Sequence, residues 1–177
     1  PQIMIPQVGS IEELNHIKSI YDNVKSDMEK KYKIKFKINF GTMLEVVRAC
    51  LTSGELTNTA EFFSFGTNDL TQAVFSFSRE DAESKFLEEY KKKEILETSP
   101  FQSIDENGVG NLMKIAISKG RQIKKNVEIG ICGEHGGDPD SIRFCHSIDI
   151  SYVSASPFRI PVAIVAAAQA AIDQKSK

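Results

Sequence analysis

Residues 61–69 read EFFSFGTND. The stretch begins with closely spaced phenylalanines, which is typical of a short buried strand, and becomes polar at Gly66. Two other apolar stretches end in the same style, FGTMLE at 40–45 and GICGEHGG at 130–137. Because parallel α/β folds bind their ligands at the carboxyl ends of the strands, these three endings are the candidate functional positions.

Outward from these stretches, an apolar strand pattern is repeatedly followed by a helical one. The first helix begins at a capping box made by Ser10 and Glu13 and carries apolar residues at helical spacing. Repeated βα units predict a parallel sheet covered by helices. Both a doubly wound sheet and a (β/α)₈ barrel have this alternation of strands and helices. Strands are expected at 1–6, 33–45, 61–69, 127–134 and 148–156. Helices are expected at 11–28, 46–57, 85–96, 111–125, after Asp138-Pro139 and after Pro161.

Two stretches depart from this regular pattern. KIKFKIN at 33–39 alternates charged with apolar residues, which is unusual for a buried parallel strand, so its lysines are expected at an exposed edge or before the barrel proper. VAIVAAAQAAI at 162–172 is apolar nearly all round. We expect this last helix to be buried, either against the barrel or against a neighbouring subunit.

The composition is that of an ordinary globular domain. The chain has 177 residues, of which 41% are hydrophobic and 26% charged, and a formal net charge of −2. We therefore expect one domain with no nucleic-acid partner and no membrane span. Three cysteines argue against a disulfide framework and favour a reducing, cytoplasmic compartment. PQIMIP at 1–6 already reads as a buried strand, so the chain is expected to begin within a fold.

Glu45 and Asp69 end two successive strands of the expected sheet. Adjacent parallel strands lie about 4.8 Å apart, so the two carboxylates could share one hard cation, and Mg²⁺ suits such a pair. Structural roles are equally compatible with the pattern. Glu45 could cap a helix or pair with Arg48, and Asp69 could cap a helix that starts at Leu70.

Gly66, Thr67 and Asn68 precede a helix and offer backbone N–H groups and two polar side chains. Such an arrangement is a natural anion site, although the same residues also make a good turn and cap. Both interpretations stay open on the spacing alone.

Cys132 has three possible roles. It could be an inert packed thiol, or a reactive thiol at a strand end that His135 could tune. It could also bind zinc together with His135, Cys145 and His146, but this spacing matches no standard structural site. Cys50 and Cys145 lie in helical stretches and are expected to be packing thiols.

Taken together, these motifs resemble the C-terminal domain of the phosphoenolpyruvate (PEP)-utilising enzymes, and within that family the pyruvate phosphate dikinases. The resemblance covers nearly the whole chain and is carried by GTMLE at 41–45, FFSFGTNDLTQ at 62–72, GICGEHGGDP at 130–139 and SASPFRIPVA at 154–163. FGTNDLTQ alone is also similar to PEP synthase and to enzyme I of the phosphotransferase system. GEHGGDP and SPFRIPVA favour the dikinase.

The resemblance implies that residues 1–177 are the C-terminal portion of a (β/α)₈ barrel, about five βα units, that binds pyruvate or PEP. It implies that the complete enzyme is a phosphotransferase that interconverts ATP, phosphate and pyruvate with AMP, pyrophosphate and PEP. A phosphohistidine domain and an ATP-binding domain of the same enzyme would precede this chain. A homodimer is expected through the C-terminal domain.

The resemblance also implies a role for each candidate residue. Glu45 and Asp69 would ligate Mg²⁺ and touch substrate, and Cys132 would be the acid/base at the methyl carbon of pyruvate. Gly66, Thr67 and Asn68 would contact the carboxylate or phosphate of the substrate. The arginines that bind substrate in the family come from earlier strands, so the isolated chain is expected to be inactive. PEP synthase, enzyme I and a non-catalytic dimerisation module are the alternatives.

Overall fold

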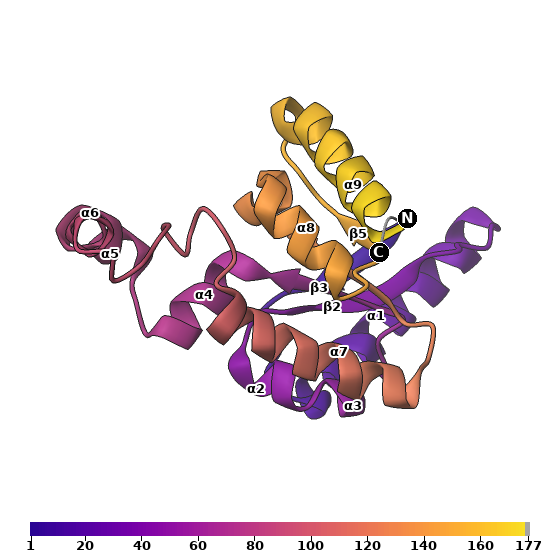
Figure 1. The fold of residues 1–177 in the computed structure, drawn as a ribbon. Coiled ribbons are helices and arrows are strands. Elements are labelled where there is room, and N and C mark those ends of the chain that lie inside the picture. The colour runs from indigo at the N-terminus through magenta and orange to yellow at the C-terminus, as the bar shows by residue number, and fades with distance from the viewer. Residues whose placement is uncertain (176–177) are drawn as a thin grey trace.

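Five parallel strands form one sheet within residues 1–175, the part of the chain that the computed structural model describes (Figure 1). Their spatial order follows the chain, β1-β2-β3-β4-β5, so each strand pairs with its successor through a crossover that carries helices. The strands are β1 (Gln2–Ile5), β2 (Asn39–Leu44), β3 (Phe62–Gly66), β4 (Glu128–Cys132) and β5 (Tyr152–Val153).

Most of the helices lie against the sheet or against one another, and two stand apart from it. In Figure 1, α2, α3 and α7 lie together on one side of the sheet, α8 packs along α9, and α5 and α6 lie at the end of an arm away from the strands. The α-helices are α1 (Ile11–Tyr32), α2 (Val47–Leu51), α3 (Ser53–Leu56), α4 (Thr67–Phe75), α5 (Arg79–Lys85), α6 (Leu87–Lys92), α7 (Asn111–Ile123), α8 (Pro139–Ser147) and α9 (Ile160–Lys175). Shorter helical turns span Glu106–Gly110, Glu134–Gly137 and Pro157–Arg159.

The fold prediction is confirmed as an α/β fold with five parallel strands in one unclosed sheet. β1 and β5 stand at the two edges of the sheet and do not pair with each other in the described residues. Two helix starts are those that the sequence predicts. Ser10 caps α1 in a full capping box with Glu13, and the Asp138 side chain accepts from the Ser141 N–H at the start of α8.

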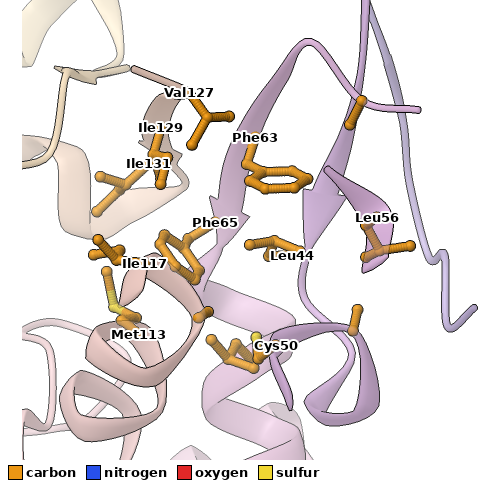
Figure 2. Packing of buried hydrophobic residues seen from close by; sticks show 14 of the residues in the cluster. Leu44, Cys50, Leu56, Phe63, Phe65, Met113, Ile117, Val127, Ile129 and Ile131 are labelled. Atoms are coloured by element: carbon orange, nitrogen blue, oxygen red, sulfur yellow. The ribbon is translucent and has the colours of Figure 1, made fainter. Parts of the chain in front are cut away.

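The main hydrophobic core lies between the sheet and the helices (Figure 2). Successive strand residues point to opposite faces of a sheet, so alternate residues of β2, β3 and β4 face these helices. From the strands come Leu44, Phe63, Phe65, Ile129 and Ile131, and from the helices Cys50, Leu56, Met113 and Ile117. The strand residues that alternate with these, such as Ser64 and Gly66 of β3, face the other side of the sheet.

Residues 33–38 are not strand, although their alternation of charged and apolar residues extends the pattern of β2. Lys33 ends α1 in the left-handed conformation, with φ 56°. Glu29 then binds the following segment from within the helix, because it accepts from Lys35 Nζ at 2.9 Å and from the Phe36 N–H at 2.9 Å. The segment is therefore held against the end of α1, and pairing with β1 begins at Asn39.

Three other elements differ from their expected extents. The helix expected at 46–57 divides into α2 and α3 at Thr52, whose backbone has φ −114° and ψ 20°. DENG at 105–108 has the composition of a turn, but Glu106–Gly110 form a π-helical turn that continues into α7. The last strand is shorter than 148–156, because the edge strand β5 pairs with β4 over two residues.

The last helix is less buried than its composition indicates. Ala163, Ala166 and Ala170 are buried, but Ile164 is 64% exposed and the preceding Phe158 is 94% exposed. Within this chain, α9 therefore covers α8 with its small residues and leaves large apolar side chains in solvent. In the described part of the chain, none of the helices combines the length and apolar character that a membrane span requires.

Candidate active site

Glu45 follows the last residue of β2 and has a buried side chain that is 4% exposed. The Gln7 N–H, from the end of β1, donates to Glu45 Oε1 at 2.7 Å. Burial raises the pKa of Glu45, and the neighbouring Asp69 carboxyl raises it further, while the Gln7 hydrogen bond opposes this. The structure therefore brings Glu45 and Asp69 together, as their positions after neighbouring strands predict.

Asp69 differs from its expected place, because α4 begins at Thr67 directly after β3. Asp69 thus lies in the first helical turn rather than at a strand end, and the N-cap is Gly66. The structural role in which Asp69 caps a helix at Leu70 is wrong for this reason. The Arg48 guanidinium donates to the Gly9 carbonyl, and no ion pair joins it to Glu45 in the described residues.

Gly66 is required by the close approach of Glu45. A Cβ added at Gly66 would lie 2.8 Å from Glu45 Cβ, which cannot swing away as the end of a side chain can, and 2.5 Å from Glu45 Oε2. The absence of a side chain at the end of β3 therefore makes room for the carboxylate that ends β2.

Cys132 ends β4 directly opposite Gly66 in the parallel register. Its thiol is partly buried and donates to the Phe65 carbonyl at 3.5 Å. Burial raises the pKa of Cys132, a hydrogen bond with Ser64 lowers it, and the negative charges of Glu45 and Asp69 raise it. All three predicted chemical groups, two carboxyls and one thiol, are thus near enough to interact.

Three polar residues lie next to Cys132 in this strand-end region, namely Thr67, Asn68 and His135. The buried Thr67 hydroxyl contacts the Cys132 carbonyl at 3.1 Å and His135 Nδ1 at 2.7 Å. Asn68 Oδ1 is buried and has no hydrogen-bond partner within the described protein atoms. Gly133 has φ +108°, a conformation that favours glycine, and its backbone lies against Asn68 and Thr67.

The donor set of this region fits Mg²⁺ better than zinc. Within residues 1–175, no group of three or more histidine, cysteine or acidic side chains is placed to hold a metal, and Cys145 is buried in α8. Two interacting carboxyls, one of which has a raised pKa, instead suit a cation that accepts one or two carboxylates and completes its shell with water and substrate oxygens. Glu45 and Asp69 are the residues that could hold it.

A cavity of about 590 Å³ lies beside the strand ends. Asn68 and Gly133 line it, and so do Arg79, Phe101 and Arg159. None of these last three residues has a role in the sequence prediction. Arg79 and Phe101 come from segments without a strand-end pattern, and Arg159 follows the last expected strand in SASPFRIPVA, where no role is assigned to it. Ser64 and Tyr152, which interact with each other and with Cys132, are also missing from the sequence prediction. Ser64 could have been found, because it is the one polar residue of FFSF in a buried strand.

Comparisons with known proteins show the family to which this chain belongs. Residues 1–172 match the family model described as PEP-utilising enzyme, PEP-binding domain. The chain is 50% identical over 175 residues to a pyruvate, phosphate dikinase of Clostridium symbiosum, covering 99% of this chain and 20% of that protein. It is 52% identical over 172 residues to the same enzyme of Entamoeba histolytica, covering 97% of this chain and 19% of that one. The chain thus spans about a fifth of the length of these relatives.

Among solved structures, a citrate lyase from Burkholderia xenovorans matches with a TM-score of 0.60 and 11% identity, over 94% of this chain and 48% of that one. At this identity the likeness concerns the fold alone. The family model, by contrast, covers residues 1–172, a range that includes the segments carrying Glu45, Asp69 and Cys132. The chain therefore belongs to the family of PEP-utilising enzymes, to the part that forms their PEP-binding domain.

Proposed function

We propose that residues 1–177 are the C-terminal part of the PEP-binding barrel of a pyruvate, phosphate dikinase. The observation that carries the proposal is the gathering of Glu45, Asp69 and Cys132 at one end of the sheet, in a chain about half identical to dikinases. The complete enzyme would interconvert ATP, phosphate and pyruvate with AMP, pyrophosphate and PEP. A phosphohistidine domain of the same polypeptide would carry the phosphoryl group to this site.

Glu45 and Asp69 would hold Mg²⁺, and Gly66, Thr67 and Asn68 would contact the substrate. The unpartnered, buried Asn68 Oδ1 and the exposed glycine Gly133 near it support a polar ligand at this position. When bound, Mg²⁺ would supply positive charge beside the enolate oxygen of the substrate. The Gln7 N–H holds Glu45 in place, so the carboxylate is oriented before any ligand arrives.

Cys132 would move the proton at the methyl carbon. Burial and the two carboxyls raise the pKa of Cys132, so the thiol carries its proton at neutral pH. It is then suited to protonate the methylene carbon of the enolate when pyruvate forms. In the opposite direction, the thiolate would remove a proton from the methyl group, and the Ser64 hydrogen bond, which lowers the pKa, would favour that form.

Homodimer formation through α9 is a second proposed role. Its support is the exposure of large apolar side chains on a helix that is otherwise well formed, such as Ile164 and Val165. We also place the enzyme in the cytoplasm, since all three cysteines are free. PEP synthase and enzyme I, which FGTNDLTQ at 65–72 also resembles, are the alternative enzymes, and a non-catalytic dimerisation module is the alternative of another class.

The test uses the complete polypeptide that contains this chain. We expect it to form PEP from pyruvate in the presence of ATP, phosphate and Mg²⁺, and Cys132→Ala to abolish this, whereas residues 1–177 alone are inactive. Dependence on phosphate with release of pyrophosphate separates the dikinase from PEP synthase and from enzyme I. A fully active Cys132→Ala enzyme would overturn the role of the thiol, and sedimentation measures the dimer.

A further inference from the structure

We propose that His135 is a positioning residue for Cys132, acting through the Thr67 hydroxyl and anchored on the Pro100 carbonyl. The inference rests on the proposed function, because it assigns a role in the proton transfer there given to Cys132. His135 itself would touch neither substrate nor metal.

The evidence is a continuous chain of short polar contacts. His135 Nε2 lies 2.9 Å from the Pro100 carbonyl, and His135 Nδ1 lies 2.7 Å from Thr67 Oγ1. Thr67 Oγ1 in turn lies 3.1 Å from the carbonyl of Cys132. His135 and Thr67 are both fully buried, so no water competes for these contacts.

The donors and acceptors fix the ring's tautomer. The Pro100 carbonyl can only accept, so Nε2 carries a proton. Burial lowers the pKa of His135, which favours a ring with that single proton and leaves Nδ1 as an acceptor. The Thr67 hydroxyl proton then lies between two acceptors, Nδ1 and the Cys132 carbonyl. The imidazole therefore determines where Thr67 sits against the backbone of the proposed catalytic residue.

The backbone around Cys132 needs such a restraint. Gly133 follows it at φ +108°, and glycine adopts many other conformations at little cost. His135 ties the chain on one side of Gly133 to Thr67, which in turn contacts Cys132 on its other side. The contacts of His135 and Thr67 thus restrain the backbone on both sides of Gly133.

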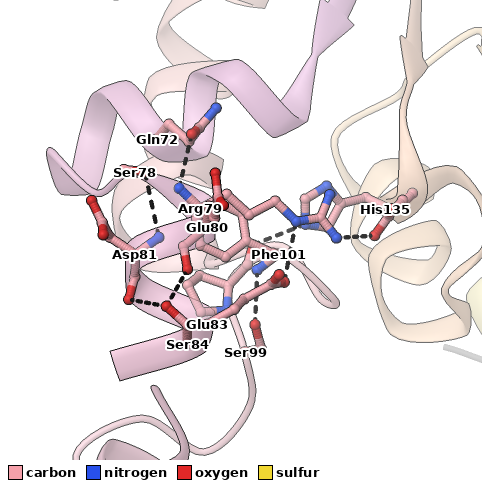
Figure 3. Close-up of polar contacts among 12 residues, drawn as sticks. Gln72, Ser78, Arg79, Glu80, Asp81, Glu83, Ser84, Ser99, Phe101 and His135 are labelled. Atoms are coloured by element: carbon pink, nitrogen blue, oxygen red, sulfur yellow. Dashed lines mark hydrogen bonds and ion pairs between the residues drawn. The ribbon is translucent and has the colours of Figure 1, made fainter. Parts of the chain in front are cut away.

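Pro100 belongs to a segment that other contacts fasten to the same loop. Arg79 pairs with Glu134 at 2.7 Å, and its guanidinium lies over the Phe101 ring (Figure 3). Ser103 donates to Asp138 at 2.8 Å. The segment that follows α6 is therefore a fixed support, and His135 transmits its position to the end of β4.

Two substitutions separate the two ends of the imidazole. In His135→Asn, the amide reaches about as far as Nδ1 and can keep the contact with Thr67, whereas in His135→Gln it reaches about as far as Nε2 and can keep the contact with Pro100. Both are made in the complete polypeptide, with the exposed His16→Gln as the matched control. An unchanged melting temperature reports intact folding of the variants, and phosphorylation by ATP and phosphate, which the proposed function assigns to other domains, reports that those domains are competent.

The readout is the pyruvate half-reaction of the phosphorylated enzyme. We expect His135→Gln to lower kcat about 100-fold with little change in KM, as a misplaced reacting group does, and His135→Asn to retain most of the rate. Equal rates in wild type and His135→Gln would overturn the assignment. Equal losses of kcat in His135→Gln and His135→Asn would also overturn it, because a ring needed only for packing is lost in both variants. A wild-type enzyme without a pyruvate half-reaction would instead overturn the proposed function, and this assignment with it.

Discussion

The two faces of the central strands carry different kinds of residue, although the residues alternate within single strands. On β3, Phe63 and Phe65 enter the core beneath the helices, whereas Ser64 and Gly66 face the side where Glu45 and Cys132 gather. The helix-covered face holds the domain together, and the opposite face carries the candidate chemistry. Substitutions on the two faces should therefore change different measured quantities.

The largest expected effect comes from the polar face. Glu45→Gln in the complete enzyme should lower the rate of PEP formation about 1,000-fold, equivalent to about 4 kcal/mol, because a neutral amide holds Mg²⁺ poorly. Glu89→Gln on α6, which loses a surface ion pair with Lys93, is the matched control and should keep full activity. Steady-state kinetics over a Mg²⁺ titration measures both, and unchanged metal dependence in Glu45→Gln would break the comparison.

The helix-covered face should respond in stability. Phe65→Ala removes a fully buried ring from the core and should destabilise the domain by about 3–5 kcal/mol. Phe158→Ala removes a ring that is 94% exposed and should change stability by less than about 0.5 kcal/mol in the monomer. Hydrogen–deuterium exchange of the β3 peptide distinguishes them. Equal protection in the two variants would contradict the assignment of this face.

The smallest expected effect is a difference in labelling among the three cysteines of the unsubstituted protein, which also compares the two faces. Cys50 and Cys145 are buried in the helix layer, and burial raises the pKa of each to about 12. Iodoacetamide should therefore label Cys132 first in the native protein, and all three only after unfolding, as peptide mass spectrometry can record. Early labelling of Cys50 or Cys145 would show that the core opens more readily than its packing indicates.

Local patterns were sufficient for much of this fold. The apolar run in β3 and the capping residues Ser10 and Asp138 act over a few positions, so their consequences can be read directly from the sequence. The same holds for Glu45 and Cys132, because a parallel sheet brings the ends of neighbouring strands together.

Contacts between distant segments could not be predicted in this way. Arg79 and Glu134 are 55 positions apart, and nothing in the charge pattern near either residue indicates the other. The place of Asp69 within α4 depends on how abruptly β3 gives way to a helix, and composition does not determine this. Similarly, the apolar composition of 162–172 says that the helix suits burial, but not that this chain leaves Ile164 exposed.

The hydrogen bonds of Thr67 have a consequence for how the protein folds. They join residues that lie 65 and 68 positions apart in the chain, to Cys132 and His135 respectively. Such long loops must close before the contacts can form, and sheets of parallel strands accordingly fold slowly. The strand-end region should therefore be among the last parts of the domain to assemble, so that a newly made chain acquires native secondary structure before it acquires a competent site.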